Sequence, residues 1–478
     1  MSRFKYLRKY FIKILGEIKM ILLLRPPLPK GEESPGIPLG AMYISSILKQ
    51  NGFDTKIIDY TIENSVNIKK IIEKYRPEIV GVSNTWSVQT MNALKIAKTI
   101  KNINKDILLV VGGNPVTVAP ENFLSVFDVA VRGEGEFSML EIAQRKKLKD
   151  IKGISYKKGG KIIHNPLQKL IFDLDKIPFP DYESIDLEKY FNPFLRLNFF
   201  QNVSERKIGM ITSRGCPFNC FFCSIHLHMG QYWRPHTAEY VLKHLEFITQ
   251  NYNIEHVNFD DDNLTFNSKR FEAILDGMKE RNIKITWDTP NGIRLDTLNR
   301  KLLRKMKENG VVRLTIAIES GSQKFIDTVI HKRINLKNAE KIAKICKEED
   351  IPLTSFYIIG MPGETKKDIE KTLNFAYMLL KKYSVIPRVS IGIPLPGIEM
   401  TKICEKNNYL KNGRIETEEF TVEDIDKYYK DFGRKLIIPF ITKLNWFTVI
   451  KNMDKFPKMA KRIWNPNKSH SFLKKINY

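Results

Sequence analysis

Short apolar runs alternate with longer amphipathic stretches from residue 20 to about residue 150. A run such as "ILLL", soon followed by prolines, predicts a buried strand, and apolar positions three and four apart in "LGAMYISSILKQ" predict a helix. Strands separated by helices predict a parallel, doubly wound sheet, whose ligands bind beyond the carboxyl ends of the strands. The expected strands lie within residues 19–27, 54–60, 78–84, 106–114 and 129–136.

A second alternation covers residues 205–397, where six apolar runs are each followed by a helix-like stretch. Six such units predict a partial parallel barrel, with the active site at the mouth formed by the loops after the strands. The expected strands lie within residues 207–213, 254–263, 283–294, 311–322, 351–364 and 388–397. The fold class is therefore α/β, with a doubly wound sheet followed by a (β/α)6 partial barrel.

The remaining segments lack this alternation. Residues 151–204 contain "DKIPFPDYESID", whose prolines predict a linker. Residues 398–478 predict a mainly helical tail that shapes the substrate region. Residues 1–19 place apolar residues at helical spacing among lysines and arginines, which is typical of a basic amphipathic helix. Such a helix either lies on a lipid surface or packs on its own domain, and both readings stay open.

Composition changes this picture little. The 478 residues allow two or three domains, and no apolar run reaches the roughly 20 residues that span a bilayer. The net charge of +25 is spread over many lysines rather than gathered in one stripe, so we expect no nucleic-acid partner. We expect a cytoplasmic protein, with peripheral contact to a membrane as the alternative that the basic ends suggest.

Three of the five cysteines lie together in "RGCPFNCFFCSIH", as Cys216, Cys220 and Cys223. Cys346 and Cys404 stand apart, so the cysteines show no disulfide framework, and a reducing compartment is expected. The C-x3-C-x2-C spacing lets one loop present three thiolates to a metal centre. A zinc ion would take His226 as its fourth ligand, whereas an iron-sulfur cluster would leave one iron open for another molecule.

This spacing, with Phe222 directly before the last cysteine, resembles the signature of the radical S-adenosylmethionine (radical SAM) enzymes. The resemblance extends over residues 205–397. It implies that Cys216, Cys220 and Cys223 hold a [4Fe-4S] cluster, that SAM binds the fourth iron, and that Phe222 belongs to the SAM site. His226 and His228 are then expected to form local hydrogen bonds rather than to bind metal.

Later strand ends carry further residues that match the family's SAM site. The resemblance implies that Asp260, beside Asp261 and Asp262, accepts hydrogen bonds from the SAM amino group. It assigns Glu319 and Ser320 to the ribose or amino-acid end of SAM, Ile358 and Gly360 to adenine, and Arg294 more weakly to the carboxylate. Any one of the acidic residues and serines could instead cap a helix.

The first sheet also resembles a known domain. "IPLGAMYISSIL", "VVGGNPVT" and "VRGEGE" resemble the cobalamin-binding domain that precedes the barrel in one radical SAM subfamily. The chain lacks the D-x-H-x-x-G motif, which implies cobalamin without a histidine below the metal, and a domain that has lost its cofactor is the alternative. The resemblance implies cobalamin contacts at Ser83, Asn84, Thr85, Gly112, Gly113, Gly133 and Glu134.

The two resemblances together imply a C-methyltransferase. A 5'-deoxyadenosyl radical would activate a carbon that has no acidic proton, and methylcobalamin would supply the methyl group. The substrate is expected to be a small or lipid-like molecule, and the reductant a protein such as flavodoxin or ferredoxin. A radical SAM cyclase or oxidoreductase is the nearest alternative, and a zinc-stabilised binding protein is the rival from another class.

Overall fold

The computed structural model describes residues 20–29, 36–63, 67–191 and 204–441. The chain divides into two compact units, one of Met1–Arg196 with Leu227–Met229 and one of Leu197–His226 with Gly230–Tyr478. The predicted helix at residues 1–19, residues 192–203 of the predicted linker and the tail after residue 441 lie outside the described residues. Within the described part, no helix is long and apolar enough to cross a membrane.

The first unit is built on one seven-stranded sheet with the order β2-β1-β3-β4-β5-β6-β7. The first five strands are parallel, as predicted, and the last two pair antiparallel. Its strands are β1 (Ile21–Arg25), β2 (Thr55–Asp59), β3 (Ile79–Ser83), β4 (Leu108–Gly112), β5 (Val129–Val131), β6 (Ile154–Lys158) and β7 (Lys161–His164).

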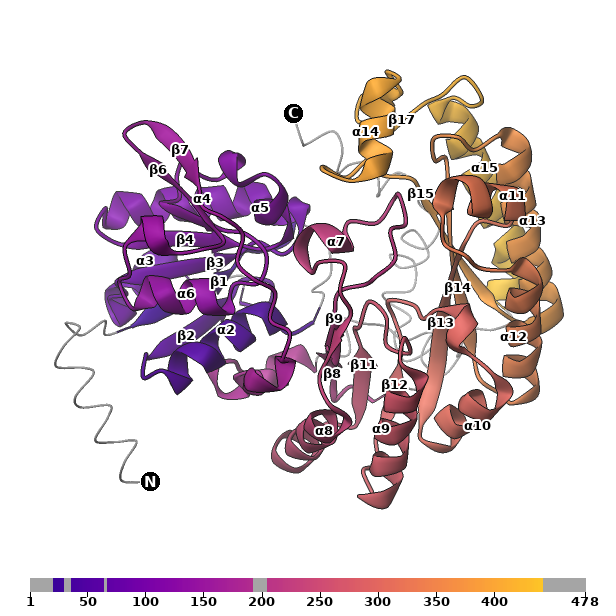
Figure 1. Ribbon diagram of the computed structural model, residues 1–478, viewed down its shortest axis with the longest axis horizontal. Helices are drawn as coiled ribbons and strands as arrows, with labels where there is room; N and C mark the ends of the chain where they lie inside the picture. The colour runs from indigo at the N-terminus through magenta and orange to yellow at the C-terminus, as the bar shows by residue number, and fades with distance from the viewer. Residues whose placement is uncertain (1–19, 30–35, 64–66, 192–203, 442–478) are drawn as a thin grey trace. The chain divides into compact units, whose positions relative to one another are not determined.

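Helices cover both faces of this sheet (Figure 1). One pair, α2 (Leu39–Gln50) and α6 (Glu136–Ala143), packs together, and so does the pair α3 (Ile68–Tyr75) and α4 (Thr90–Ile103). The short α5 (Asn114–Val118) follows β4. Because the central strands are apolar on both faces, they bury the side chains that the continuous hydrophobic runs predict.

Residues 151–191 are not a linker, contrary to the prediction. Gly159 and Gly160, with φ of 55° and 78°, form the two-residue turn between β6 and β7, a turn that favours glycine because both positions need positive φ. Beyond the hairpin, Ile171, Leu174 and Ile177 pack in one apolar cluster with side chains of α2. The prolines in this stretch therefore shape a segment that is packed against the sheet's own helices.

The second unit contains six parallel strands in the order β15-β14-β13-β12-β11-β8, which confirms the predicted partial barrel (Figure 1). The strands are β8 (Lys207–Met210), β11 (His256–Phe259), β12 (Thr286–Asp288), β13 (Val311–Glu319), β14 (Leu353–Ile359) and β15 (Ile386–Ile391). A short ladder of β9 (Ser213–Arg214) and β10 (Arg234–Pro235) follows β8.

The helices between these strands begin at side-chain caps. Each of the five capping residues accepts a hydrogen bond from a backbone N–H in the first turn of its helix, which satisfies a donor that would otherwise lack a partner. The helices and their caps are α8 (Ala238–Tyr252, Thr237), α9 (Ser268–Glu280, Asn267), α10 (Arg300–Glu308, Asn299), α12 (Leu336–Glu348, Asn335) and α13 (Lys366–Tyr383, Thr365).

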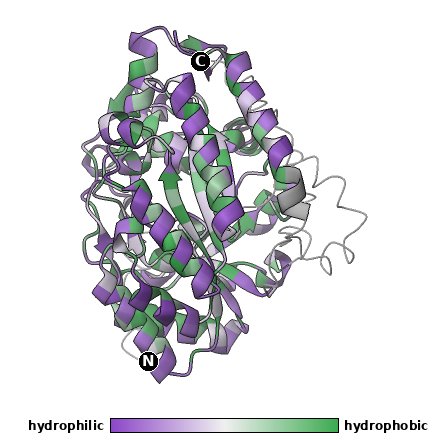
Figure 2. Cartoon of the chain, turned by 90° about the vertical axis from the view of Figure 1, so that its right-hand side faces the viewer, coloured by the Kyte–Doolittle hydropathy of each residue, from purple (hydrophilic) through white to green (hydrophobic). Residues whose placement is uncertain are grey.

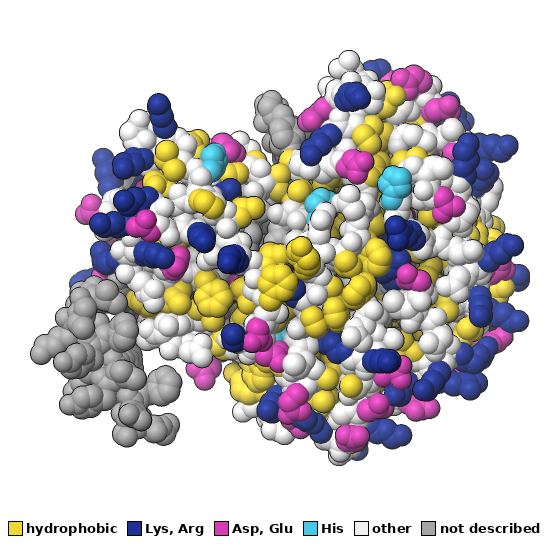
Figure 3. All heavy atoms as spheres, in the orientation of Figure 1, with side chains coloured by type: hydrophobic (Ala, Val, Ile, Leu, Met, Phe, Trp, Pro, Cys, Tyr) yellow, Lys and Arg dark blue, Asp and Glu magenta, His cyan; other side chains and the backbone are white. Residues whose placement is uncertain are grey.

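The described tail is mainly helical, as predicted. It contains α14 (Glu399–Lys406), a hairpin of β16 (Leu410–Lys411) and β17 (Arg414–Ile415), and α15 (Val422–Ile441). Figure 2 shows green strands behind helices whose faces toward the viewer are largely purple, the amphipathic pattern on which the sequence prediction rests. On the face drawn in Figure 3, Lys and Arg side chains lie scattered among Asp and Glu.

Candidate functional site

The three clustered cysteines lie on the loop between β9 and the short helix α7 (Ile225–His228). Cys220 is buried, while Cys216 and Cys223 are half-buried, and the Cys223 amide donates to the Cys220 carbonyl oxygen at 2.9 Å. Burial raises the pKa of all three thiols, that of Cys223 to about 12, and the Cys216 and Cys220 charges raise the Cys223 value further. The thiols therefore lie close together and need a metal cation to hold them as thiolates.

Positive groups and a donor surround this loop. The Asn263 amide donates to Cys216 Sγ at 3.8 Å, and the charges of Lys332 and Arg294 oppose the rise in the pKa of Cys220. The Arg294 guanidinium lies 3.6 Å from the Phe218 ring centroid and donates to Asp296 at 2.9 and 2.7 Å. Three soft sulfur ligands fit an iron-sulfur cluster, and the two cations near them are each paired with a carboxylate.

The two histidines after the loop differ. Burial lowers the pKa of His226, and its Nδ1 is buried without a hydrogen-bond partner among the described residues, so the expected local bonding is not found at this atom. His228 is buried. Among the residues that the structure describes, no three His, Cys, Asp or Glu side chains are arranged to hold a single metal ion.

The three aspartates after β11 have separate positions. Asp261 is fully buried and accepts hydrogen bonds from the Thr212 amide at 3.0 Å, the Thr212 hydroxyl at 2.8 Å and the Ser213 hydroxyl at 2.5 Å. Asp260 is half-buried, and its backbone bonds to Met210 on the neighbouring strand. Asp261 thus fastens the start of the cysteine loop to β11, an anchoring role that the sequence did not single out.

Asp262 is exposed, although many protein atoms surround it. This combination is typical of a side chain on a concave surface. Desolvation, followed by the charge of Asp261, raises the pKa of Asp262 to about 7. Asp260 and Asp262 are therefore the accessible carboxylates of this group.

The end of β13 is held in an unusual conformation. Glu319 is buried with a φ of 72°, a left-handed conformation that is uncommon for a residue with a side chain, and its carboxylate pairs with Lys332 Nζ at 2.5 Å. The Glu319–Lys332 pair lies near the cysteines, because both charges act on Cys220. The predicted residue Glu319 and the three cysteines are therefore brought together.

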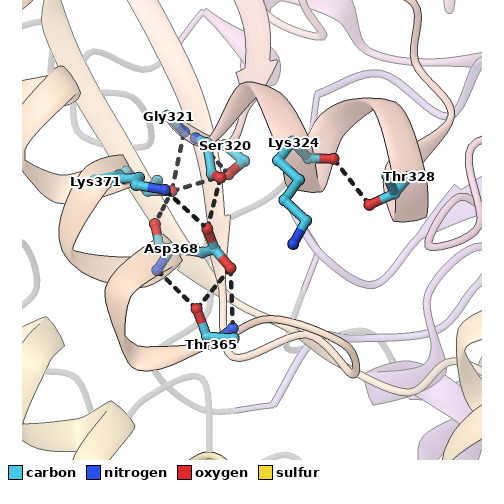
Figure 4. A network of polar contacts seen from close by, with 9 residues as sticks. Ser320, Gly321, Lys324, Thr328, Thr365, Asp368 and Lys371 are labelled. Atoms are coloured by element: carbon cyan, nitrogen blue, oxygen red, sulfur yellow. Dashed lines mark hydrogen bonds and ion pairs between the residues drawn. The ribbon is translucent and has the colours of Figure 1, made fainter.

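Ser320 does not present its hydroxyl to a ligand in this structure. Its side chain is fully buried and shares a 3.0 Å hydrogen bond with Thr372 of α13, whose hydroxyl also accepts from the Gly321 amide at 2.9 Å. Figure 4 shows that this hydrogen-bond network includes Asp368, which accepts a hydrogen bond from the Thr365 hydroxyl and forms an ion pair with Lys371. The network fixes the loop after β13 to α13.

The end of β14 combines one accessible residue with a buried carboxylate. Ile358 is half-buried, and Phe222 of the cysteine loop is also half-buried, with its ring edge-on to Phe221. Gly360 is buried at φ 78°, and its amide donates to Glu364 Oε2 at 2.7 Å. Glu364 is fully buried, which raises its pKa to about 8. Glu364 was missed as a site residue, although it ends the "GMPGE" sequence after the strand.

In the first unit, the loops after β3 and β4 touch. The backbone amide of Asn84 donates a hydrogen bond to the Gly112 carbonyl oxygen at 2.8 Å. A side chain on Gly113, at φ 124°, would overlap the backbone carbonyl group of Asn84. Asn84 is fully buried, and its Oδ1 has no hydrogen-bond partner among the described residues. The glycines and the unpaired oxygen form a backbone surface that a large ligand can approach closely, which fits a cobalamin-type group.

The other residues predicted to contact cobalamin at this edge of the first sheet are of two kinds, some accessible and some facing the protein interior. Ser83 is half-buried and Thr85 is exposed, next to Trp86, of which 50% is exposed. Gly133 donates its amide to the Thr117 hydroxyl at 2.9 Å. Glu134 turns inward, because its carboxylate is buried and accepts from the Ile171 amide at 2.9 Å. Glu134 thus holds the 165–191 segment rather than facing the edge.

Two family models match the chain, the Radical SAM superfamily over residues 210–376 and the B12 binding domain over residues 33–143. An "uncharacterized methyltransferase" of Pyrococcus horikoshii is 34% identical over 408 residues, covering 82% of this chain and 85% of the relative. An "anaerobic magnesium-protoporphyrin IX monomethyl ester cyclase" of Rubrivivax gelatinosus is 24% identical and covers 71% of this chain and 61% of its own length.

Solved structures show the same fold. The "cobalamin-dependent S-adenosylmethionine radical enzyme OxsB", solved with aqua-cobalamin and S-adenosylmethionine, superposes with a TM-score of 0.64 at 22% identity. The match covers 75% of this chain, and the chain spans about half (52%) of the length of that enzyme.

Proposed function

Because this chain belongs to the radical SAM superfamily and carries a B12-binding domain, we propose that it is a cobalamin-dependent methyltransferase that methylates an unactivated carbon. The observation that carries the proposal is the cysteine loop, which follows the first strand of a six-stranded partial barrel and carries three cysteines whose charges act on one another. A relative named as a methyltransferase is similar over four fifths of both chains.

In this proposal Cys216, Cys220 and Cys223 hold a [4Fe-4S] cluster. When bound, the cluster with SAM supplies a radical that activates the substrate carbon, and cobalamin supplies the methyl group. The protein's own residues position these groups. Asp261 fixes the cysteine loop through Thr212 and Ser213, while Arg294 and Lys332 balance the negative charge of the thiolates.

The SAM contacts are proposed from accessibility. The carboxylates of Asp260 and Asp262 can accept hydrogen bonds from an ammonium group, and Ile358 and Phe222 offer apolar surface. Arg294 and the Glu319–Lys332 pair supply charges near the cluster. Ser320 and Gly360, by contrast, act as positioning residues, since both are buried and bonded to α13 and Glu364 respectively.

For cobalamin we propose contacts with the loops after β3, β4 and β5. Ser83, Thr85 and the exposed Trp86 offer side chains, and Asn84 offers its unpaired Oδ1. Gly112, Gly113 and Gly133 allow the ligand to approach the backbone, while Glu134 positions the neighbouring segment.

The tail contributes to the substrate site in this proposal. The Met400 amide at the start of α14 donates to the Phe221 carbonyl oxygen in the cysteine loop at 3.0 Å, and Ile425 of α15 lies against Gly360. Radical SAM enzymes act on small molecules and need a reductant, for which flavodoxin or ferredoxin is the proposed class. We propose a cytoplasmic location because thiolate ligands need a reducing compartment.

The test is anaerobic purification and reconstitution with iron, sulfide and hydroxocobalamin, followed by product analysis after addition of SAM and a strong reductant. We expect brown protein and the formation of both 5'-deoxyadenosine and S-adenosylhomocysteine. 5'-Deoxyadenosine alone would favour the cyclase alternative, which the Rubrivivax gelatinosus relative supports. A colourless zinc protein would overturn the proposal.

A further inference from the structure

The sheet of the second unit has two chemically different faces. Side chains alternate between faces along a strand, and residues paired between parallel strands share a face. Leu314, Ile316, Tyr357 and Ile359 are fully or almost fully buried on the outer face, which the helices cover. The opposite, inner face of the last three strands carries Thr315, Thr354, Phe356, Arg388 and Ser390.

Arg388 lies on this inner face at the middle of β15, where it is paired with Phe356. The register fixes its side, because Phe356 is paired with Ala317 and both lie beside Gly292 in the loop after β12. Ser390, two residues on, shares the face and is paired with Ile358, the residue proposed for the SAM site. The two polar side chains are therefore neighbours of the proposed SAM site within one sheet.

The Arg388 guanidinium has no ionic partner among the residues that the structure describes. It keeps accessible surface, yet it forms no ion pair or hydrogen bond with any residue in the described part of the chain, and the Ser390 hydroxyl forms none either. Desolvation lowers the pKa of Arg388, the charge of Arg313 lowers it further, and Asp288 opposes both effects. Arg388 is exposed, yet protein atoms lie around it on several sides, as expected for a side chain over the concave inner face of the sheet.

Asp288, whose charge acts on Arg388, is already neutralised by another arginine. Asp288 pairs with Arg313 and accepts from the Asn258 amide at 2.6 Å. Burial lowers the pKa of the neighbouring His256, so this ring is neutral at pH 7. Arg313 and Arg388 against Asp288 leave a net charge of +1 (two cations less one anion) on this part of the inner face. A second donor, Arg313 Nε, is buried without a hydrogen-bond partner among the described residues.

We propose that Arg388, together with Ser390, binds an oxyanion group of the methyl-acceptor substrate, either a carboxylate or a phosphate-type group. This inference rests on the proposed function, since it names the substrate class of the same site. A guanidinium presents parallel N–H donors that match the two oxygens of such a group. Because Arg388 is exposed and has no counter-ion among the described residues, a bound anion would supply the ionic partner.

The experiment titrates reconstituted, cobalamin-loaded enzyme with SAM present, using sodium methylphosphonate, inorganic phosphate and acetate as probes at matched ionic strength. Binding is read by isothermal calorimetry. We expect saturable binding of at least one anion. The affinity should fall about tenfold or more in Arg388→Gln and less in Arg388→Lys, which keeps the positive charge but lacks the two parallel N–H donors. The preferred probe tells a phosphate-type from a carboxylate group.

The matched control is Arg434→Gln, which removes an arginine that is 77% exposed on α15 and should leave anion binding unchanged. Equal binding to wild type and Arg388→Gln, or no binding of any probe to wild type, would overturn the inference. So would a parallel loss of SAM affinity in Arg388→Gln, because it would assign Arg388 to SAM. If wild type instead fails to cleave SAM while Arg388-dependent anion binding persists, the proposed function fails and the anion site stands.

Discussion

The two sheets of this protein offer their ligands different surfaces. In the first unit, β1 is buried along its whole length, β3 along all but its last residue, and β4 at its three central residues. In the second unit, β15 keeps accessible residues along its length, and the inner face of the barrel carries paired and unpaired charges. A ligand of the first sheet can therefore reach only the loops at its edge, whereas a ligand of the second can also reach side chains along the strands.

This difference decides which kind of residue makes each site. At the edge of the first sheet, the recognition surface is mostly backbone, shaped by Gly113 against Asn84. In the barrel, the site consists of side chains with distinct chemistry, from Cys220 to Glu319. Substitutions in one unit should therefore damage one cofactor and spare the other.

The largest expected effect is that of Cys220→Ala. Without one of three thiolates the cluster should not assemble, and 5'-deoxyadenosine formation should fall by about 1,000-fold or more, since the chemical step depends wholly on the cluster. Cobalamin should remain bound, as seen in its absorption spectrum. Cys346→Ala, which removes a buried cysteine of α12 away from the loop, is the control and should keep SAM cleavage. Cleavage by the Cys220 variant would show that the cysteine loop is not the cluster site.

Gly113→Ala tests the proposed cobalamin site of the first unit, as Cys220→Ala tests the cluster site of the barrel. A methyl group there would overlap the Asn84 carbonyl group at a φ that disfavours alanine, so the two loops must separate. We expect cobalamin retention after gel filtration to fall about tenfold, which corresponds to about 1.4 kcal/mol of lost affinity, with the iron content unchanged.

The control for this variant is Gly40→Ala in α2, where a methyl group would meet nothing within 4 Å. Because alanine favours a helix over glycine by about 1 kcal/mol, this control should keep cobalamin and resist heat slightly better. Equal retention by the two variants would mean that cobalamin does not depend on the close approach at Gly113.

The same contrast explains what the sequence could predict. Both sheets follow from hydrophobic periodicity, and the cysteines follow from their spacing, because each signal is local. The roles of Ser320 and Glu134 could not be predicted, since each depends on a partner distant in the chain, Thr372 and the Ile171 amide. Whether a polar residue faces a ligand or the protein interior is decided by packing, which no local pattern reports.

The hairpin of β6 and β7, which extends the first sheet, was not predicted, although its signal in the sequence is local. Gly159 and Gly160, which lie between "ISYKK" and "KIIH", are a local turn signal, but the prolines that follow led to the prediction of a linker for the whole region. Arg388 was overlooked because a single arginine in a strand is unremarkable until the register places it on the inner face.

A smaller effect, confined to the barrel, should follow from Glu364→Gln. Burial raises the pKa of Glu364 to about 8, so its protonated form is favoured in the folded state. Its contribution to stability is complete below the ordinary carboxyl pKa and is lost as pH rises through about 8. We expect the free energy of unfolding in urea to fall between pH 7 and 9 for the wild type, by on the order of 1 to 2 kcal/mol, and to change less for Glu364→Gln.

The matched control for Glu364 is the exposed Glu280→Gln at the end of α9, which should keep the wild-type pH dependence. The same slope in all three proteins would show that Glu364 does not titrate in this range.

An effect of similar size should come from Asp181→Asn, which sharpens the comparison by acting on the first unit with the opposite pH dependence. Burial opposes ionisation of Asp181, but hydrogen bonds from Lys49, Ser184 and Ser45 outweigh it and lower its pKa. Its contribution to stability is therefore complete above the ordinary carboxyl pKa and is lost as pH falls through the lower pKa of the folded state.

At pH 7, hydrogen exchange of the α2 amides in Asp181→Asn should become about fivefold to thirtyfold faster, for a loss of about 1 to 2 kcal/mol of local stability. Exchange in the barrel strands should not change, and neither unit should respond to the exposed control Asp150→Asn. If the barrel amides also exchanged faster in Asp181→Asn, the two units would open together, and the separation of their sites would not extend to their stability.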